Sequence, residues 1–209
     1  MYIPKAFHVD DVNELITFIR NHSFGIMVSQ TEEEPFATHL PFLLDEQKGE
    51  NGVLISHLAR ANPHWQGLQD QKVLVVFQGP HAYISPTWYD EPRTVPTWNY
   101  VAVHVYGTFR QIQDKHKVKE WIEKTVNVYE QTMNPPWEAV FDEPFMEGLL
   151  NGIVAFEIEV ERMEGNWKLN QNHPIERQER VVKKLKSINE PNAQKMAELM
   201  EKEIEKRNK

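Results

Sequence analysis

Residues 98–112 read WNYVAVHVYGTFRQI, and this stretch decides the fold class. Apolar side chains recur at every second position, at Val101, Val103 and Val105, between side chains of mixed character. A period of two residues is that of a β-strand with different environments on its two faces. Gly107 interrupts the alternation, which predicts either a bulge or a close approach of a neighbouring backbone.

Shorter segments with the character of strands lie on both sides of this stretch, at residues 24–30, 36–44, 52–57, 72–78, 82–85 and 153–161. Helical spacing of apolar residues is found at 10–19, 63–69, 114–131, 145–150, 175–188 and 192–207. About seven strands at hairpin-like spacing, with helices between and after them, predict an antiparallel barrel in an α+β frame. We expect a barrel domain over residues 1–174 and a helical C-terminal tail over residues 175–209.

The composition is that of a globular protein, with 209 residues of which 40% are hydrophobic and 26% are charged. The absence of cysteine excludes disulfides, thiolate zinc sites, iron–sulfur clusters and a cysteine nucleophile. No apolar run is long enough to cross a bilayer, and the first residues lack the pattern of a signal peptide. We therefore expect a cytoplasmic protein that does not contact a membrane.

Charge is unevenly distributed along the chain. The net charge is −8, but residues 177–209 hold ten Lys or Arg against six Asp or Glu, a balance of +4. An acidic body is poorly suited to bind nucleic acid, so any DNA contact is expected from the basic tail, where Arg177, Arg180 and Lys184 can share a helix face. The alternative is that Val181, Leu185 and Ile188 dock this helix on the barrel and leave its charges in solvent.

The sequence lacks the motifs of several common enzyme classes. Nine histidines occur without the spacing of a metal site, so we expect no metal. There is no glycine-rich phosphate loop, no dinucleotide-binding motif and no Gly-x-Ser-x-Gly. Nucleotide hydrolysis and serine hydrolysis therefore have no support.

The segment from Ser56 to Gln78 offers a candidate anion site. Arg60 lies between the end of a predicted strand and the start of a predicted helix, where its charge and free backbone N–H groups could hold a phosphate. His57, Asn62 and His64 could add hydrogen bonds. Alternatively, Arg60 and Asn62 only cap the helix, with Pro63 in its first turn.

Two further segments are open to two interpretations each. Residues 79–100 combine prolines and aromatic residues, which could wall a planar ligand or a subunit interface, or could simply pack in the core. Residues 166–172 read NWKLNQN, and Lys168 with Asn170 and Gln171 could hold a phosphate or ring heteroatoms. A polar solvated loop is the alternative for this segment.

At the level of longer motifs, the chain resembles the PaiB family over nearly its whole length. The motifs that carry the resemblance are THLPF at 38–42, SHLARANP at 56–63, VFQGP at 76–80, YISP at 83–86, VPTWNY at 95–100 and KLNQN at 168–172. The resemblance implies an FMN-binding split β-barrel that forms a homodimer. It also implies a negative transcriptional regulator linked to protease synthesis and sporulation.

The resemblance also points to cofactor-binding residues. Residues 52–78 are similar, more distantly, to the phosphate-binding segment of pyridoxamine-phosphate oxidases, which places Arg60 and Asn62 nearest the FMN phosphate. The expected cofactor site consists of His39, His57, Arg60, Asn62, Lys168 and Gln171, with no catalytic residue assigned. The expected partners are a second copy of the chain, a flavin or another small-molecule effector, and DNA. The alternative function is an FMN-dependent oxidoreductase that acts on a small molecule.

Overall fold

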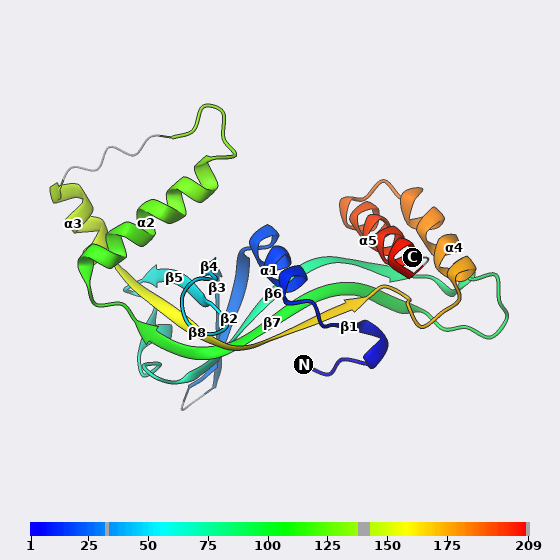
Figure 1. Ribbon diagram of the computed structural model, residues 1–209, viewed down its shortest axis with the longest axis horizontal. Helices are drawn as coiled ribbons and strands as arrows, with labels where there is room; N and C mark the ends of the chain where they lie inside the picture. Colours follow the sequence, from blue (N-terminus) through cyan, green and yellow to red (C-terminus); the bar gives the residue numbers. More distant parts are fainter. Residues whose placement is uncertain (32–33, 138–142, 208–209) are drawn as a thin grey trace. The chain divides into compact units, whose positions relative to one another are not determined.

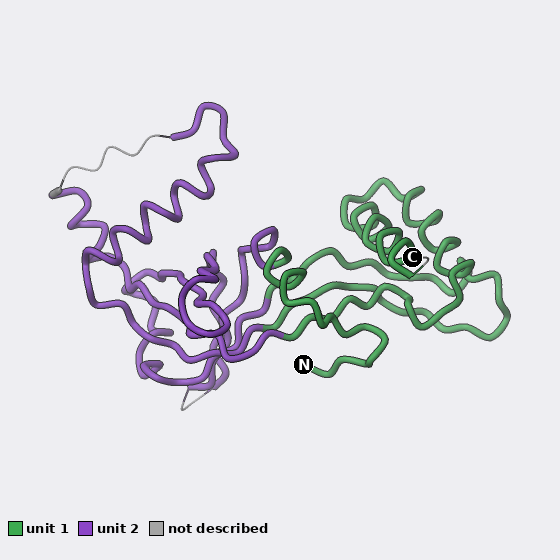
Figure 2. The backbone as a smooth tube through the Cα atoms, in the orientation of Figure 1, with its two compact units in different colours: residues 1–18, 77–104, 164–209 green, residues 19–76, 105–163 purple. Residues whose placement is uncertain are grey.

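The computed structural model describes residues 1–31, 34–137 and 143–207 (Figure 1). The chain divides into two compact units (Figure 2). Unit 1 contains residues 1–18, 77–104 and 164–209, and unit 2 contains residues 19–76 and 105–163. Three long strands, β6 (Lys72–Ile84), β7 (Thr97–Gln111) and β8 (Ile153–Lys168), contribute residues to both units.

The described strands form one eight-stranded sheet in the order β3-β2-β6-β7-β8-β5-β4, with β1 paired to β8. Every pair with a defined register is antiparallel. The shorter strands are β1 (His8–Val9), β2 (Phe24–Gln30), β3 (Pro35–Pro41), β4 (Leu43–Asp45) and β5 (Val53–Ala59). The two ends of this order, β3 and β4, are consecutive in the sequence and are separated only by Phe42, so the strand order closes on itself.

Phe42 fixes this corner in unit 2. Its side chain is only 1% exposed, and its N–H donates to the Ser23 carbonyl at 2.8 Å. Its ring meets Phe156 edge-on at 6.4 Å, and Phe156 stacks on Phe109 at 4.7 Å between ring centroids. These rings from the β3–β4 corner, β7 and β8 fill the interior of the unit, where their burial stabilises the closed arrangement.

Unit 2 also carries the helices α2 (Lys115–Glu130) and α3 (Glu143–Asn151). Asp114 caps α2, since its Oδ1 accepts hydrogen bonds from the N–H groups of His116 and Lys117. The helix expected over 63–69 is shorter than predicted: a 3-10 turn covers Pro63–Trp65 only. Gln66 is already extended, at a φ of −68° and a ψ of 128°, and Gly67 follows at a φ of +75°.

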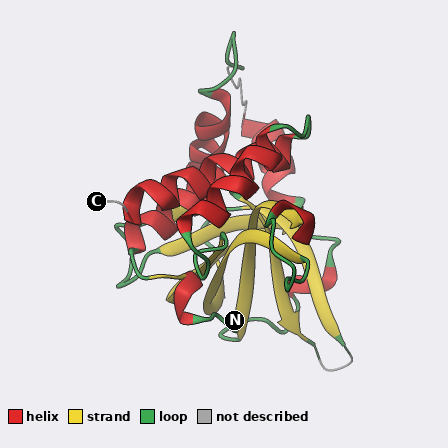
Figure 3. Ribbon diagram, turned by 90° about the vertical axis from the view of Figure 1, so that its right-hand side faces the viewer, coloured by secondary structure: helices red, strands yellow, loops and turns green. Residues whose placement is uncertain are grey.

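In unit 1 the helices α4 (Ile175–Lys186) and α5 (Pro191–Arg207) pack on each other and on the strands (Figure 3). Val181 and Leu185 of α4 and Met196 and Met200 of α5 are fully buried, and Asn99 of β7 donates to the Met200 sulfur at 3.4 Å. The alternative interpretation, a docked tail helix, therefore holds for Val181 and Leu185, whereas Ile188 is 37% exposed. The 3-10 turns Lys5–Phe7 and Pro86–Trp88 also belong to this unit, and α1 (Val12–Asn21) begins in it.

Two strands are longer than the sequence pattern predicts. The segments expected at 72–78 and 82–85 are one strand, β6, because Gly79 fits into close packing instead of breaking the strand: a Cβ there would lie 2.6 Å from Val101 and 2.8 Å from Phe18. The strand expected to end at residue 161 continues as β8 to Lys168, where Gly165 pairs with Val9 of β1. The division expected between residues 174 and 175 stays a prediction. None of the described helices is long and apolar enough to cross a membrane.

Gly107 of β7 lies close to the backbone of β8, which confirms the close approach expected from the sequence. A Cβ at this position would lie 2.3 Å from the Glu159 carbonyl oxygen. We expect Gly107→Ala to lower the free energy of unfolding by about 1–3 kcal/mol, because backbone atoms must move to accept it. Urea denaturation measures this change. The control is Gly148→Ala in α3, where a Cβ meets nothing within 4 Å and a gain of about 0.5–1 kcal/mol is expected. Equal stabilities for the two variants would contradict the close approach.

Candidate functional site

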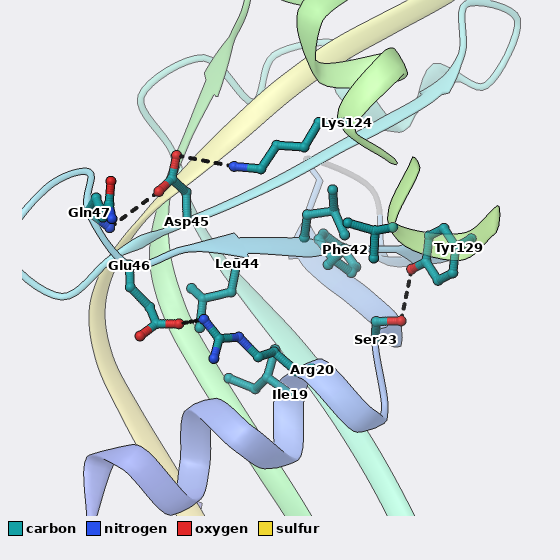
Figure 4. Close-up of a pocket in the computed structure, with 12 residues that line it drawn as sticks. Ile19, Arg20, Ser23, Phe42, Leu44, Asp45, Glu46, Gln47, Lys124 and Tyr129 are labelled. Carbon is teal, nitrogen blue, oxygen red and sulfur yellow. Dashed lines mark hydrogen bonds and ion pairs between the residues drawn. The ribbon is translucent and has the colours of Figure 1, made fainter. Parts of the chain in front are cut away.

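A cavity of about 510 Å³ in unit 2 lies between the end of α1, the corner after β3 and helix α2 (Figure 4). Arg20 forms an ion pair with Glu46, and Lys124 lies 3.9 Å from Asp45. The Ser23 and Tyr129 hydroxyls hydrogen-bond to each other at 2.8 Å. Since the polar groups of this cavity satisfy one another, its arrangement does not favour a charged ligand.

Arg60 follows β5 and holds the junction between α3 and β8. Its Nε donates to the Asn151 carbonyl at 2.7 Å and its Nη2 to the Ile153 carbonyl at 2.6 Å, while its own N–H donates to the Gly152 carbonyl at 2.9 Å. These bonds orient the guanidinium group and leave its Nη1 without a hydrogen-bond partner among the residues that the structure describes. The side chain is exposed, so this group can still meet a ligand.

A cavity of about 210 Å³ in unit 2 borders Arg60. Arg60 and Lys115 both line it, and none of its lining residues is acidic. Lys115 also contacts Glu147 at 3.4 Å, an exposed ion pair that contributes little stability. The lining residues are Arg60, Gln111, Ile112, Gln113, Lys115, Val118, Leu150, Asn151, Ile153, Val154 and Ala155. The cavity therefore offers two positive charges to an anion.

Asn62 belongs to a separate polar network in unit 2. Its Oδ1 accepts the His64 N–H at 3.0 Å, which confirms its capping role, and its Nδ2 donates to the Thr38 hydroxyl at 3.3 Å. The His64 ring hydrogen-bonds the Thr38 hydroxyl at 2.7 Å and the Ser29 hydroxyl at 2.9 Å. His64 is only 2% exposed, and burial lowers its pKa. The network thus holds a neutral imidazole between β2, β3 and the 63–65 turn.

The two other unit 2 residues of the expected site lie apart from these groups. His39 is exposed on β3, with its ring 6.3 Å from that of Phe24. His57 is half-buried on β5, and burial lowers its pKa. Neither lines the cavity at Arg60. Within unit 2, the structure brings Arg60 to Lys115 and Asn62 to His64, and it leaves the two histidines outside both groups.

Lys168 and Gln171 belong to unit 1, at the end of β8. The Gln171 amide accepts the Leu169 N–H at 2.7 Å and donates to the Trp167 carbonyl at 2.5 Å, so it closes the turn after the strand. The Lys168 Nζ donates to the Thr97 hydroxyl at 2.6 Å. Asn166, Trp167, Leu169 and Asn170 are buried, so the interpretation of residues 166–172 as a solvated loop is wrong.

Some groupings of candidate residues carry no signal in the sequence. Lys115 lies at the start of α2, a position typical of a solvated helix surface. It lines the Arg60 cavity only because α2 packs on the rest of unit 2. In unit 1, Arg93 and Arg177 line a cavity together with Lys168, although the three residues are far apart in the sequence. Within the described residues, no group of three or more His, Asp or Glu is arranged to hold a metal ion.

Burial of His64 predicts a pH dependence of stability. Its pKa lies below the ordinary value of about 6.5 in the folded chain. The unfolded chain therefore binds a proton more readily, and stability falls as the pH drops below about 6.5 towards the folded pKa, by at most about 1.4 kcal/mol per pH unit for this group. Urea denaturation at several pH values should show a shallower loss for His64→Gln than for the unchanged chain. Identical slopes for the two chains would show that His64 does not contribute to the pH dependence of stability.

The chain matches a known protein family over most of its length. The family model described as "Putative FMN-binding domain" matches residues 1–162. The Protease synthase and sporulation protein PAI 2 of Bacillus subtilis is 39% identical over 209 residues, which cover 99% of each chain.

Two solved structures share the fold at low sequence identity. The FAD and heme binding protein of Mycobacterium smegmatis has a TM-score of 0.58 at 11% identity, over 77% of this chain and 73% of that one. The flavocytochrome Anf3 of Azotobacter vinelandii has a TM-score of 0.60 at 11% identity, over 79% and 72% of the two chains. The expected α+β fold, an antiparallel FMN-binding split β-barrel with C-terminal helices, is confirmed. The chain belongs to the family of this FMN-binding domain and is a homologue of the PAI 2 protein.

Proposed function

We propose that this protein is a negative transcriptional regulator of the PAI 2 type and that it binds FMN. The observation that carries the proposal is the similarity to PAI 2, which extends over 99% of both chains and includes the C-terminal helices. A relative matched over its full length shares the whole arrangement of elements rather than one module. The proposed regulation therefore concerns protease synthesis and sporulation, the processes that the name of this relative gives.

FMN as the ligand has three kinds of support. The family model carries the description "Putative FMN-binding domain", and the two solved structures above are described as a FAD and heme binding protein and a flavocytochrome. The chain itself offers a cavity of about 210 Å³ with two cations and no acidic lining residue, which suits a phosphate dianion. When bound, the flavin would supply redox chemistry, and the chain would supply its binding and orientation.

We propose that Arg60 holds the FMN phosphate in this cavity and that Lys115 adds a second positive charge. A phosphate contact of Asn62, whose amide is bonded to Thr38 and His64, stays a prediction. The backbone carbonyls at 151 and 153 already fix the plane of the Arg60 guanidinium, so little conformational entropy is lost on binding. Lys115 lines the same cavity from α2. Contacts of the flavin with the other expected residues stay a prediction, namely those with His39, His57, Lys168 and Gln171.

Removing the Arg60 guanidinium should weaken FMN binding. We expect Arg60→Ala to raise the Kd at least about tenfold, since a charge-assisted hydrogen bond contributes roughly 1.5–3 kcal/mol. Lys115→Gln should act in the same direction, without disturbing the carbonyl contacts at 151 and 153. Flavin fluorescence titration measures both.

The matched control is Arg110→Ala in the same unit, which removes the exposed ion pairs of Arg110 to Asp70 and Glu159. Circular dichroism of each variant reports whether it is folded. An FMN affinity that is unchanged in both Arg60→Ala and Lys115→Gln would remove this cavity from the flavin site.

A direct contact with DNA is proposed for the exposed lysines of α4. Arg177 and Arg180 both bind Glu91 at 3.2 Å, so they are partly neutralised within the protein. Lys183 and Lys184 are exposed on the same helix and have no ion-pair partner among the described residues. They are therefore the α4 residues best placed to neutralise phosphates.

Charge reversal tests this contact better than removal of the tail, because α4 and α5 bury apolar side chains and a truncated chain would lose part of its core. We expect Lys183→Glu with Lys184→Glu to weaken binding to duplex DNA and to reduce its salt slope by about two. Fluorescence anisotropy at several salt concentrations measures both quantities. Lys117→Glu with Lys119→Glu on α2 is the control. An equal effect of the two pairs, or no DNA binding by the unchanged chain, would contradict a direct contact through α4.

We also propose that the protein forms a homodimer. In unit 1, Trp98 is 55% and Tyr83 is 47% exposed, and their rings lie 5.8 Å apart with His81 beside Trp98. An exposed aromatic cluster of this kind is typical of an interface. Sedimentation equilibrium of the full-length chain reports the mass, and a monomer at high concentration would count against the dimer.

A further inference from the structure

Unit 1 contains a cavity of about 410 Å³ beside the end of β8. Its walls come from the segment between β6 and β7, from the turn after β8 and from the start of α4. The lining residues are Phe7, Tyr89, Arg93, Thr94, Val95, Pro96, Thr97, Lys168, Asn170, Asn172, His173 and Arg177. Three of them are cations and none is a carboxylate, in a chain whose net charge is −8.

Asn170 supplies a buried donor to this cavity. The residue is only 2% exposed, and its side-chain Nδ2 has no hydrogen-bond partner among the described residues. Its backbone adopts a φ of +65°, a region that Asn tolerates better than most residues. A buried amide without a partner costs free energy, and native proteins keep such groups chiefly where a ligand or an ordered water completes them.

Arg177 is held rigidly at the wall of the same cavity. Its guanidinium carbon lies 3.7 Å from the centroid of the Tyr89 ring, and its Nη1 donates to Glu91 at 3.2 Å. Its side chain is 12% exposed, and its Nε is buried without a partner in the described part of the chain. The stacked, tethered guanidinium is thus oriented before any ligand arrives.

Lys168 completes the set of donors. Its Nζ uses one hydrogen in the bond to the Thr97 hydroxyl and keeps two for a ligand. Lys168 and Arg93 have no ion-pair partner among the described residues, and Glu91 is shared between Arg177 and Arg180. The positive charge around the cavity is therefore only partly compensated by the protein itself.

We propose that this cavity binds a small organic anion, with a carboxylate or phosphate group held by Lys168, Asn170 and Arg177. Apolar atoms of Phe7, Val95 and Pro96 provide walls for the body of the ligand. The volume lies in the range of small-molecule sites, about 300–1,000 Å³, and exceeds what a bare inorganic anion needs. The proposal goes beyond the flavin and the regulation proposed above and requires neither.

Calorimetric titration of the full-length chain, without FMN, tests the proposal with matched probes. Benzoate and phenyl phosphate carry the same ring on the two anionic groups, inorganic phosphate carries the charge without an apolar body, and benzyl alcohol carries the ring without charge. We expect benzoate or phenyl phosphate to bind at least about tenfold more tightly than inorganic phosphate and benzyl alcohol. The tighter of the two identifies the anionic group. Absence of binding by both would overturn the proposal.

Variants locate the binding in this cavity. Asn170→Gly removes the side-chain amide and keeps the positive φ without strain, so the turn stays folded. Lys168→Gln keeps a hydrogen-bond donor and removes the charge. Each should weaken the better probe about tenfold or more. Lys195→Gln, an exposed lysine of α5, is the matched control and should leave the affinity unchanged. Equal weakening in all three variants would show non-specific attraction and overturn the proposal.

Testing the variants of one site with the ligand of the other site distinguishes the FMN site from the anion site. Arg60→Ala should leave binding of the anion probe unchanged, because Arg60 is not among the residues that line this cavity. Failure of FMN to bind the unchanged chain would contradict the proposed function and leave the anion site in place. Loss of anion binding in Arg60→Ala, with Asn170→Gly unaffected, would overturn the site at Lys168.

Discussion

The closure of the strand order at Phe42 is the constraint on which unit 2 depends. β3 and β4 stand at opposite ends of the sheet order, yet only one residue separates them in the chain. The chain must therefore turn sharply there, and the buried Phe42 ring anchors the turn against Phe156. The filled interior supports the antiparallel pairing of β5 with β8. That pairing sets the position of Arg60, which follows the end of β5 directly.

The candidate sites are built by polar groups that the fold has already oriented. Backbone carbonyls at 151 and 153 hold the Arg60 guanidinium in unit 2, and Tyr89 with Glu91 holds that of Arg177 in unit 1. Such tethering costs each cation some of its hydrogen-bonding capacity. In return, the remaining donors point in a defined direction before a ligand arrives, so less entropy is lost on binding. The cavity in Figure 4 differs because the carboxylates of Asp45 and Glu46 themselves line it, beside Arg20 and Lys124.

Most of the elements were predictable from the sequence because their patterns are local. The alternation at 98–112 and the strand at 24–30 agree with β7 and β2 to within one residue, and the two C-terminal helices begin and end close to their predicted bounds. The continuity of β6 was not predictable, since Gly79 and Pro80 are typical of turns and only the packing of Phe18 and Val101 shows why a glycine stands there. The candidate sites were predictable only in part. Arg60 and Lys168 could be singled out, but their neighbours Lys115 and Arg177 come from distant segments that packing alone brings near.

The central claim is that the segment after β5 and the α3–β8 junction form a ligand-binding site for FMN. Hydrogen–deuterium exchange of the full-length chain, with and without saturating FMN, tests this claim most directly, because it reports every segment at once. The account predicts slower exchange at residues 58–64 and 150–155 when FMN is present. Unchanged exchange in both segments, with FMN bound and protection confined to other parts of the chain, would contradict it.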